Sequence, residues 1–256
     1  MLKFKVDTRR NGFESAVVTE GLFDESLTEL NRRGYELISL QQNVDLRIRS
    51  GLGARICQKH NFIKEGAVYH KGERGIIVRD SPYLEDSKLL HEAIQLASQT
   101  APFQPIPLFS TPDAALYEHF FKQAKEDSSK PPRERRAFIM PPEKEDKSVI
   151  PDLEYLMFTT GQSPEDIRFA PKEHPDKVNP DICDFLLGEF GQAYFEFVGT
   201  NVLGFKPLIE DELKNLPGTV PIQLVFESDG RYYCSNINGR ARFHREEVRG
   251  IKQIID

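Results

Sequence analysis

Cysteine, tryptophan and long apolar runs are scarce in this sequence. Its 256 residues include three cysteines and no tryptophan. Cys57, Cys183 and Cys234 form an odd, sparse set, which excludes the disulfide framework of small secreted proteins. No apolar run approaches the roughly 18 residues that a membrane helix needs, and polar residues interrupt the N-terminus from Lys3 onward, unlike a signal peptide. We therefore expect a soluble, cytoplasmic protein that does not associate with membranes.

The chain is long enough to form more than one hydrophobic core. With 39% hydrophobic residues, it has the material for one large core or two smaller ones. The stretch 122–150 is rich in charge and proline and has no apolar residue between Lys125 and Arg133, so burial there does not offset the entropy of ordering. We predict a linker at 122–150 between domains at 1–121 and 151–256. The predicted fold class is α+β, and each domain is expected to be a small antiparallel sheet of hairpins or a meander packed with helices.

Charge is distributed unevenly along the chain. The net charge is −6, but residues 1–80 carry 14 Lys and Arg against 11 Asp and Glu, whereas residues 151–256 carry 11 against 18. Residues 1–80 are therefore expected to form a mildly basic part of the first domain, and the second domain is expected to be acidic. Such an asymmetry suits docking of the acidic half on a protein partner or on another copy of the chain, although a difference of this size also arises by chance.

Turn and cap residues predict several elements of the first half. Gly and Asn at a tight turn favour a hairpin, Ser, Thr and Asp favour helix starts, and Gly favours helix ends. The expected elements are a hairpin at 2–18 turning at Asn11-Gly12, a helix from Asp24 to Arg33, a strand at 35–41, and helices beginning at Ser87 and Thr111.

The second half is expected to end in a three-stranded meander followed by a helix. The three strands lie at 223–227, 232–235 and 241–244, separated by Asp229-Gly230 and Asn238-Gly239, which supply the positive φ angles of hairpin turns. Upstream, helices are predicted to start at 163–164 and 179–180, and a strand is predicted at 193–198.

The strongest functional pattern is an alternation of apolar and basic residues between 45 and 79. An antiparallel meander would turn the basic side chains to one face, where cations contact phosphates and an aromatic ring stacks on an unpaired base. The candidate nucleic-acid or anion-binding residues are Arg47, Arg49, Arg55, Lys59, Phe62 and Lys64. The alternative is an ordinary solvated sheet face. The turn at 50–55, rich in glycine, either aims N–H groups at an anion or is a plain hairpin turn.

Catalytic patterns are incomplete. The pair Cys57 and His60 lacks a second ligand pair, so no metal site is predicted, and no nucleophile elbow is present. Carboxylates at 176–196 suit Mg²⁺, and Asp181 with Glu196 resembles the start of a metal-dependent nuclease pattern, but Val198 stands where that pattern needs lysine.

These observations favour a noncatalytic binding protein without a cofactor, whose expected partner is a single-stranded nucleic acid or another phosphate-bearing ligand. Two alternatives stay open. One is a metal-dependent hydrolase or nuclease acting on a phosphorylated substrate, and the other is a structural subunit of a larger assembly. The catalytic residues of such an enzyme are not identified by the sequence.

Overall fold

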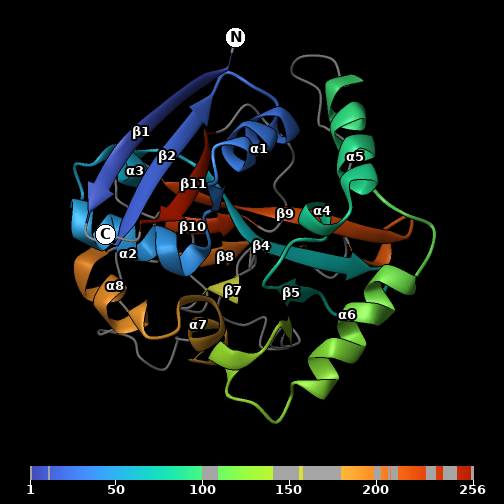
Figure 1. The fold of residues 1–256 in the computed structure, drawn as a ribbon. Helices are drawn as coiled ribbons and strands as arrows, with labels where there is room; N and C mark the ends of the chain where they lie inside the picture. Colours follow the sequence, from blue (N-terminus) through green and yellow to red (C-terminus); the bar gives the residue numbers. More distant parts are fainter. Residues whose placement is uncertain are drawn as a thin grey trace.

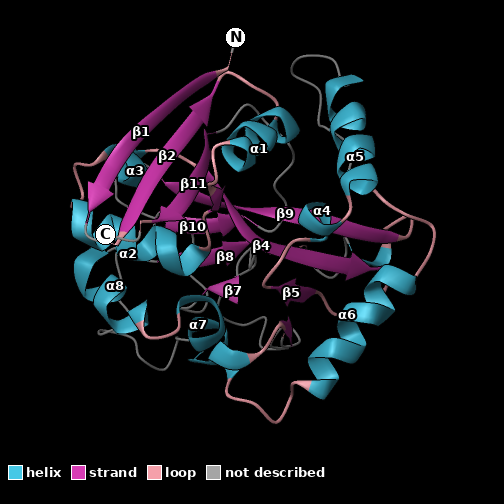
Figure 2. Ribbon diagram, in the orientation of Figure 1, coloured by secondary structure: helices cyan, strands magenta, loops and turns pink. Residues whose placement is uncertain are grey.

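The computed structural model describes residues 2–10, 12–99, 109–140, 156–157, 180–198, 203–206, 208, 213–228, 235–238 and 247–254. A central sheet carries helices on both of its faces (Figures 1 and 2). The strands are β1 (Lys3–Arg10), β2 (Phe13–Thr19), β3 (Glu36–Leu37), β4 (Asn61–His70), β5 (Ile76–Val78), β6 (Ala137–Ile139), β7 (Leu156–Met157), β8 (Leu203–Lys206), β9 (Thr219–Ser228), β10 (Ser235–Asn238) and β11 (Glu247–Gln253). The helices are α1 (Phe23–Arg32), α2 (Leu40–Ser50), α3 (Arg55–Gln58), α4 (Pro82–Glu85), α5 (Ser87–Gln99), α6 (Ala115–Glu126), the 3₁₀ turn η1 (Pro132–Glu134), α7 (Pro180–Leu187) and α8 (Phe190–Val198).

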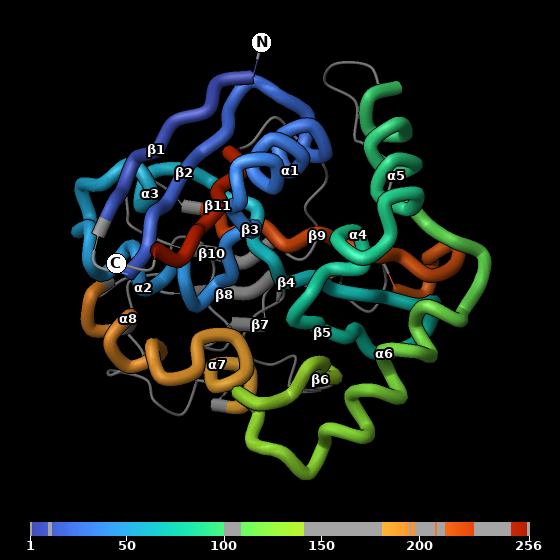
Figure 3. Tube along the Cα trace, in the orientation of Figure 1, coloured from blue at the N-terminus to red at the C-terminus, as the bar shows by residue number. Residues whose placement is uncertain are grey.

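The sheet joins the two ends of the chain. Its main path runs β1-β2-β11-β4-β9-β10-β8-β7, with β3 beside β11, β5 beside β4, and β6 beside β5. The last described strand, β11, is antiparallel to β2 and parallel to β4, so it lies next to the N-terminal hairpin (Figure 3). The predicted α+β class is confirmed.

Strands from the two predicted domains share this one sheet. β4 pairs with β9 and β11, and two of the pairings, β11 with β4 and β10 with β8, are parallel. The expectation of a separate small antiparallel sheet in each half is therefore corrected, because long-range pairing of strands far apart in sequence is not encoded in local patterns. Whether residues 151–256 fold as an independent unit stays a prediction.

Apolar side chains from alternate positions of the strands fill a core on each face of the sheet. On one face, β2, β4, β9 and β11 pack against α1, α4 and α5. On the other face, β4 and β9 pack against α2, α7 and α8. Phe62 and Ile63 show the alternation, since these neighbours on β4 are both fully buried but belong to opposite cores. α6 covers β5 and β6 in a third cluster.

The N-terminal predictions are largely confirmed. β1 and β2 form the expected hairpin, and Gly12 has the positive φ of +86° that the turn requires. α1 begins at Phe23, one residue before the predicted Asp24, because the side chain of Glu25 accepts a 3.1 Å hydrogen bond from the N–H of Leu22 and caps the helix there. The predicted helix starting near Ser87 is α5, whereas α6 begins at Ala115, four residues after the predicted start at Thr111, and Thr111 instead forms a bridge with Thr219.

The predicted meander at 45–79 is wrong for its first part, which is helical. Ser39 caps α2 by accepting a 3.2 Å hydrogen bond from the N–H of Gln42, and the side chain of Gln42 accepts one from the N–H of Ser39. Leu40 and Val44, four residues apart, then face the core together. The alternation of apolar and basic residues is real, but the helix buries some of the basic side chains as well.

Two predictions in the second half are also wrong. The predicted strand at 193–198 is part of helix α8, and the predicted C-terminal helix is strand β11. Gly230, Gly239 and the helix start at 163–164 lie outside the described residues. The helix predicted at 179–180 is α7.

The described part of the predicted linker is packed against the domain. β6 pairs with β5, placing Phe138 opposite Ile77. The buried carboxylate of Asp127 accepts hydrogen bonds from Lys130 Nζ at 2.7 Å and from the backbone N–H of Arg136 at 3.0 Å. These contacts fix residues 127–140, and residues 141–150 lie outside the described part.

In the described ranges, no helix has both the length and the apolar character needed to span a membrane.

A basic corner over a buried arginine network as the candidate functional site

The structure distributes the six predicted site residues over a helix, a turn and a strand. Arg47 and Arg49 lie on α2, Arg55 on α3 and Lys59 directly after it. Phe62 and Lys64 lie on β4.

The structure overturns the assumption that all six form an outward sheet face. Arg47 is 1% exposed and Phe62 is fully buried, so neither side chain is accessible to a ligand. Lys64 is partly exposed and pairs with Asp80 at 2.9 Å. Phe62 packs against Phe23 with ring centroids 4.6 Å apart, which accounts for its burial. Base stacking through Phe62 is therefore excluded by the fold.

Three of the six residues remain together at an exposed corner between α2 and α3. We call Arg49, Arg55 and Lys59 the basic corner. Gly51 ends α2 with a φ of +84°, which turns the chain toward α3. Arg55 begins α3 and Lys59 directly follows its last residue, and both residues are exposed.

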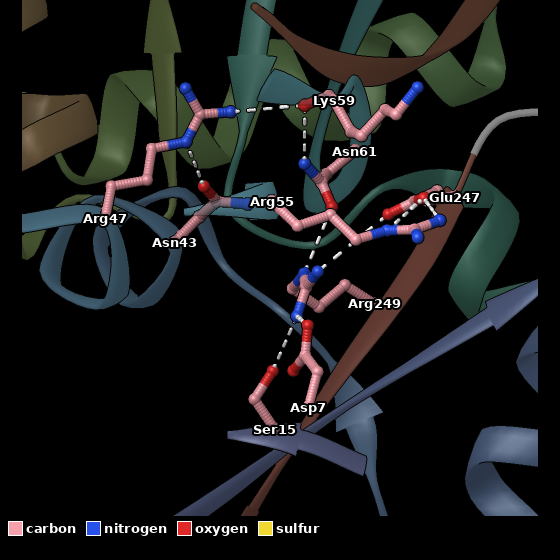
Figure 4. A network of polar contacts seen from close by, with 9 residues as sticks. All are labelled: Asp7, Ser15, Asn43, Arg47, Arg55, Lys59, Asn61, Glu247 and Arg249. Carbon is pink, nitrogen blue, oxygen red and sulfur yellow. Dashed lines mark hydrogen bonds and ion pairs between the residues drawn. The ribbon is translucent and has the colours of Figure 1, made fainter. Parts of the chain in front are cut away.

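Beneath the corner, Arg47 holds the backbone in place. Its Nε donates to Asn43 at 2.8 Å and its Nη2 donates to the carbonyl of Lys59 at 3.5 Å. Its guanidinium lies 3.9 Å from the ring centroid of Phe226, a cation–π distance. Asn61 also donates to the carbonyl of Lys59, at 2.8 Å (Figure 4). The exposed lysine side chain thus begins from a backbone that two buried side chains fix.

A second buried arginine continues the network toward the N-terminal hairpin. Arg249 on β11 is fully buried, and its Nε donates to Asn61 at 3.2 Å. Its Nη1 donates to Asp7 on β1 at 2.5 Å and to Ser15 on β2 at 3.1 Å. Asn61 thus links the residues under the corner to the first and last strands of the sheet.

Glu247 on β11 connects the exposed and buried parts of this network. Nε of Arg55 donates to Oε1 of Glu247 at 2.9 Å, and Nη2 of Arg55 donates to the same oxygen. The hydrogen bond from Arg55 to Glu247 raises the pKa of the guanidinium. Arg55 is 55% exposed whereas Glu247 is 10% exposed, so the pair joins solvent to the interior. Figure 4 shows Glu247 with Arg55 on one side and Arg249 on the other.

Arg49 has a partner within its own helix. Its Nε donates to Asp45 at 2.6 Å across one turn of α2, and its guanidinium lies 6.0 Å from the ring centroid of Phe13. The thiol of Cys57, buried next to the corner, has a raised pKa because burial disfavours the thiolate. An unreactive thiol of this kind fits packing rather than chemistry.

Two of the carboxylates proposed as metal ligands make hydrogen bonds within the protein. Asp184 accepts a 3.1 Å hydrogen bond from the N–H of Arg133, and Glu196 accepts one from Gln192 at 2.8 Å. Asp176 lies outside the described residues. Among the residues that the structure does describe, no three His, Cys, Asp or Glu side chains gather as metal ligands.

Of the nine residues of the network in Figure 4, the sequence predicted Arg47, Arg55 and Lys59 and missed the other six. Asp7, Ser15, Asn61, Glu247 and Arg249 come from four strands, and the last two were assigned to a helix. No local pattern marks them, because each owes its role to a partner distant in sequence. The strand around Arg249 reads Glu-Val-Arg-Gly-Ile-Lys-Gln, a mixed pattern that gives no sign of which charge is buried.

Comparison with known proteins gives the fold alone. No protein-family profile matches the sequence, and no curated protein matches it. One solved structure is similar, with a TM-score of 0.56 and 12% identity over 97% of this chain and 100% of that one. It is described as accommodation of massive sequence variation in Nanoarchaeota by the C-type lectin fold. The arrangement of strands and helices described above is thus similar to a C-type lectin fold.

Proposed function

We propose that this chain is a noncatalytic binding protein that takes a phosphate-bearing ligand at the basic corner, with single-stranded nucleic acid as the macromolecular form of that ligand. Arg55 and Lys59 are the proposed phosphate contacts. Arg49 adds positive charge nearby. The guanidinium and the ammonium of this corner both suit phosphate oxygens, since both donate charge-assisted hydrogen bonds.

The observation that carries the proposal is the support beneath Lys59. Arg47 and Asn61 both donate to its carbonyl, and Arg47 is itself held by Asn43. A binding side chain that starts from a fixed backbone loses less conformational entropy when it meets its ligand. The buried Arg47 therefore acts through positioning, which replaces the direct contact predicted from the sequence.

The similar solved structure supports a binding role at the level of fold. Its description says that a C-type lectin fold accommodates massive sequence variation. A fold that accommodates sequence variation is suited to presenting different binding residues, although a fold by itself does not set the ligand. We further propose a cytoplasmic location, which the scarcity of cysteine supports.

Salt-dependent binding of a fluorescein-labelled single-stranded RNA tests the proposal. Each neutralised phosphate contributes about 0.7 to the slope of log affinity against log salt, so Arg55→Gln with Lys59→Gln is expected to lower the slope by roughly 1.4. The control pair Lys88→Gln with Lys122→Gln removes two exposed lysines of α5 and α6, on the other side of the molecule from α3 (Figure 1), and leaves the slope unchanged. Absence of binding by the folded wild-type chain at low salt, or an unchanged slope in the corner variant, would contradict it.

A further inference from the structure

Glu247 makes one complete contact and one incomplete contact. Oε1 accepts both hydrogen bonds from Arg55, whereas Oε2 is buried and has no hydrogen-bond partner. The incomplete contact is with Arg249: its Nη2 lies 3.9 Å from Oε2, too far for a hydrogen bond, and is likewise buried without a partner. Two buried polar atoms of opposite charge therefore face each other across a short gap.

Leaving buried polar atoms unpaired is costly, and such atoms call for an explanation in a native structure. A small turn of the carboxylate toward Arg249 would complete the hydrogen bond and pair both atoms. The turn is opposed by the contacts to Arg55, which hold the carboxylate on the solvent side. The carboxylate is observed in a position bonded to Arg55, and a second position, bonded to Arg249, is within reach of it.

We propose that Glu247 is an internal competitor for the phosphate site: it holds Arg55 until a phosphate takes its place, and then turns to Arg249. The inference rests on the proposed function, because it concerns the same Arg55. In the first position the carboxylate occupies the guanidinium that the ligand needs. In the second position the carboxylate that has been displaced stays paired, so the ligand does not leave a buried charge without a partner.

This arrangement assigns Glu247 a role in affinity and selectivity. A ligand must offer Arg55 a better acceptor than a carboxylate held nearby, and a phosphate with several oxygens and more charge does so. Ligands that carry only a carboxylate gain little over Glu247 itself. The site is therefore expected to prefer phosphate over carboxylate groups.

Binding of the labelled RNA to Glu247→Gln gives the first test. The neutral amide no longer competes as an ion, so affinity is expected to rise roughly two- to five-fold, the factor that corresponds to an exposed ion pair. The control for net charge is Glu92→Gln, which removes one negative charge at an exposed position of α5 and leaves the Arg55–Glu247 pair in place. An equal gain in both variants would reduce the effect to general charge and overturn the competition.

Side-chain NMR of the wild-type chain with ¹⁵N-labelled arginine gives the second test and needs no stable variant at Glu247. Arg249 is fully buried and cannot touch the RNA, yet its guanidinium signals are expected to shift on addition of RNA along with those of Arg55. Shifts at Arg55 with none at Arg249 would refute the turn of Glu247 while leaving the proposed function intact. Absence of RNA binding would refute the proposed function instead.

Discussion

Arg249 donates a hydrogen bond of 2.5 Å to Asp7, which precedes it by 242 residues in the chain. Asp7 lies on β1 and Arg249 on β11, and β2 runs between these two strands. Ser15 on β2 accepts from the same Nη1 atom, so one buried guanidinium binds three neighbouring strands. The N-terminal hairpin is thus fastened to the last described strand by polar contacts as well as by the sheet.

Arg249→Met is expected to destabilise the protein by about 3–5 kcal/mol, because it leaves the carboxylate of Asp7 without its buried partner. Urea unfolding monitored by far-ultraviolet circular dichroism measures the loss. Arg9→Met is the control, since Arg9 is 73% exposed and its pair with Glu14 at 3.4 Å contributes at most about 1 kcal/mol. A loss for Arg249→Met no larger than that of the control would show that the network does not stabilise the fold.

Glu65 is expected to make stability fall as pH rises from about 4.5 to about 7. Its carboxyl is buried on β4, and burial raises its pKa from 4.5 to about 7, while the hydrogen bond that it accepts from the N–H of Leu40 acts in the opposite direction. Between these two values the unfolded chain has lost a proton that the folded chain retains, so the folded state loses about 3 kcal/mol relative to the unfolded one.

Glu65→Gln should remove this part of the pH dependence, because the amide resembles the protonated carboxyl and does not titrate. Urea unfolding midpoints of the variant and the wild type are compared at intervals from roughly pH 4 to pH 8, a range that spans the ordinary and the raised pKa of Glu65. Glu92→Gln, at an exposed position of α5, is the control and should keep the wild-type slope. Parallel pH profiles for wild type and Glu65→Gln would contradict the raised pKa.

Gly66→Ala is expected to lower stability through crowding. A Cβ at this position of β4 would lie 2.8 Å from Cα of Ser81 and 3.0 Å from the carbonyl oxygen of Ile222, and backbone atoms cannot easily move aside. Overpacking of this kind costs roughly 1–3 kcal/mol. Gly53→Ala is the matched control, because a Cβ there meets nothing within 4 Å. Thermal unfolding should show a lower midpoint for the first variant alone, and equal midpoints would disprove the close packing of β4.

Asp127→Asn is expected to expose the 128–136 turn to trypsin. Hydrogen bonds from Arg136, and then from Lys130, hold the pKa of the Asp127 carboxyl below its usual value of 3.8. The stability that it contributes is therefore present above pH 3.8 and is lost as the pH falls through the lowered pKa. At neutral pH the amide cannot replace the charged contacts, so cleavage within 128–136 should accelerate.

Time courses of limited trypsin digestion, read by mass spectrometry, measure this cleavage. Glu126→Gln is the control, because the neighbouring side chain is 54% exposed and its contact with Arg136 is 3.8 Å long. Cleavage of Asp127→Asn at the wild-type rate would mean that the contacts of Asp127 with Lys130 and Arg136 do not order the turn.

Local signals in the sequence determined the hairpin, several helices and the α+β class. Asn11-Gly12 specified the first turn, and the sequence around Ser87 specified the start of α5, because caps and positive φ angles depend on neighbours within a few positions. The same reasoning located the basic corner, since Arg49, Arg55 and Lys59 are close in sequence.

Only the tertiary structure decided which charges face solvent and which strands pair. The segment around Arg47 alternates like a strand, but its cap at Ser39 and its burial against the sheet make it a helix that turns Arg47 inward. The sequence does not distinguish an exposed Phe62 that stacks on a base from a Phe62 in the core. Its packing against Phe23 shows that it lies in the core. The segment at 247–253 is a strand because it pairs with β2 on one side and β4 on the other. The residues that it pairs with in both strands lie more than 180 positions away in the sequence. Hydrophobic burial and strand pairing act across such distances, so no window of neighbouring residues contains them.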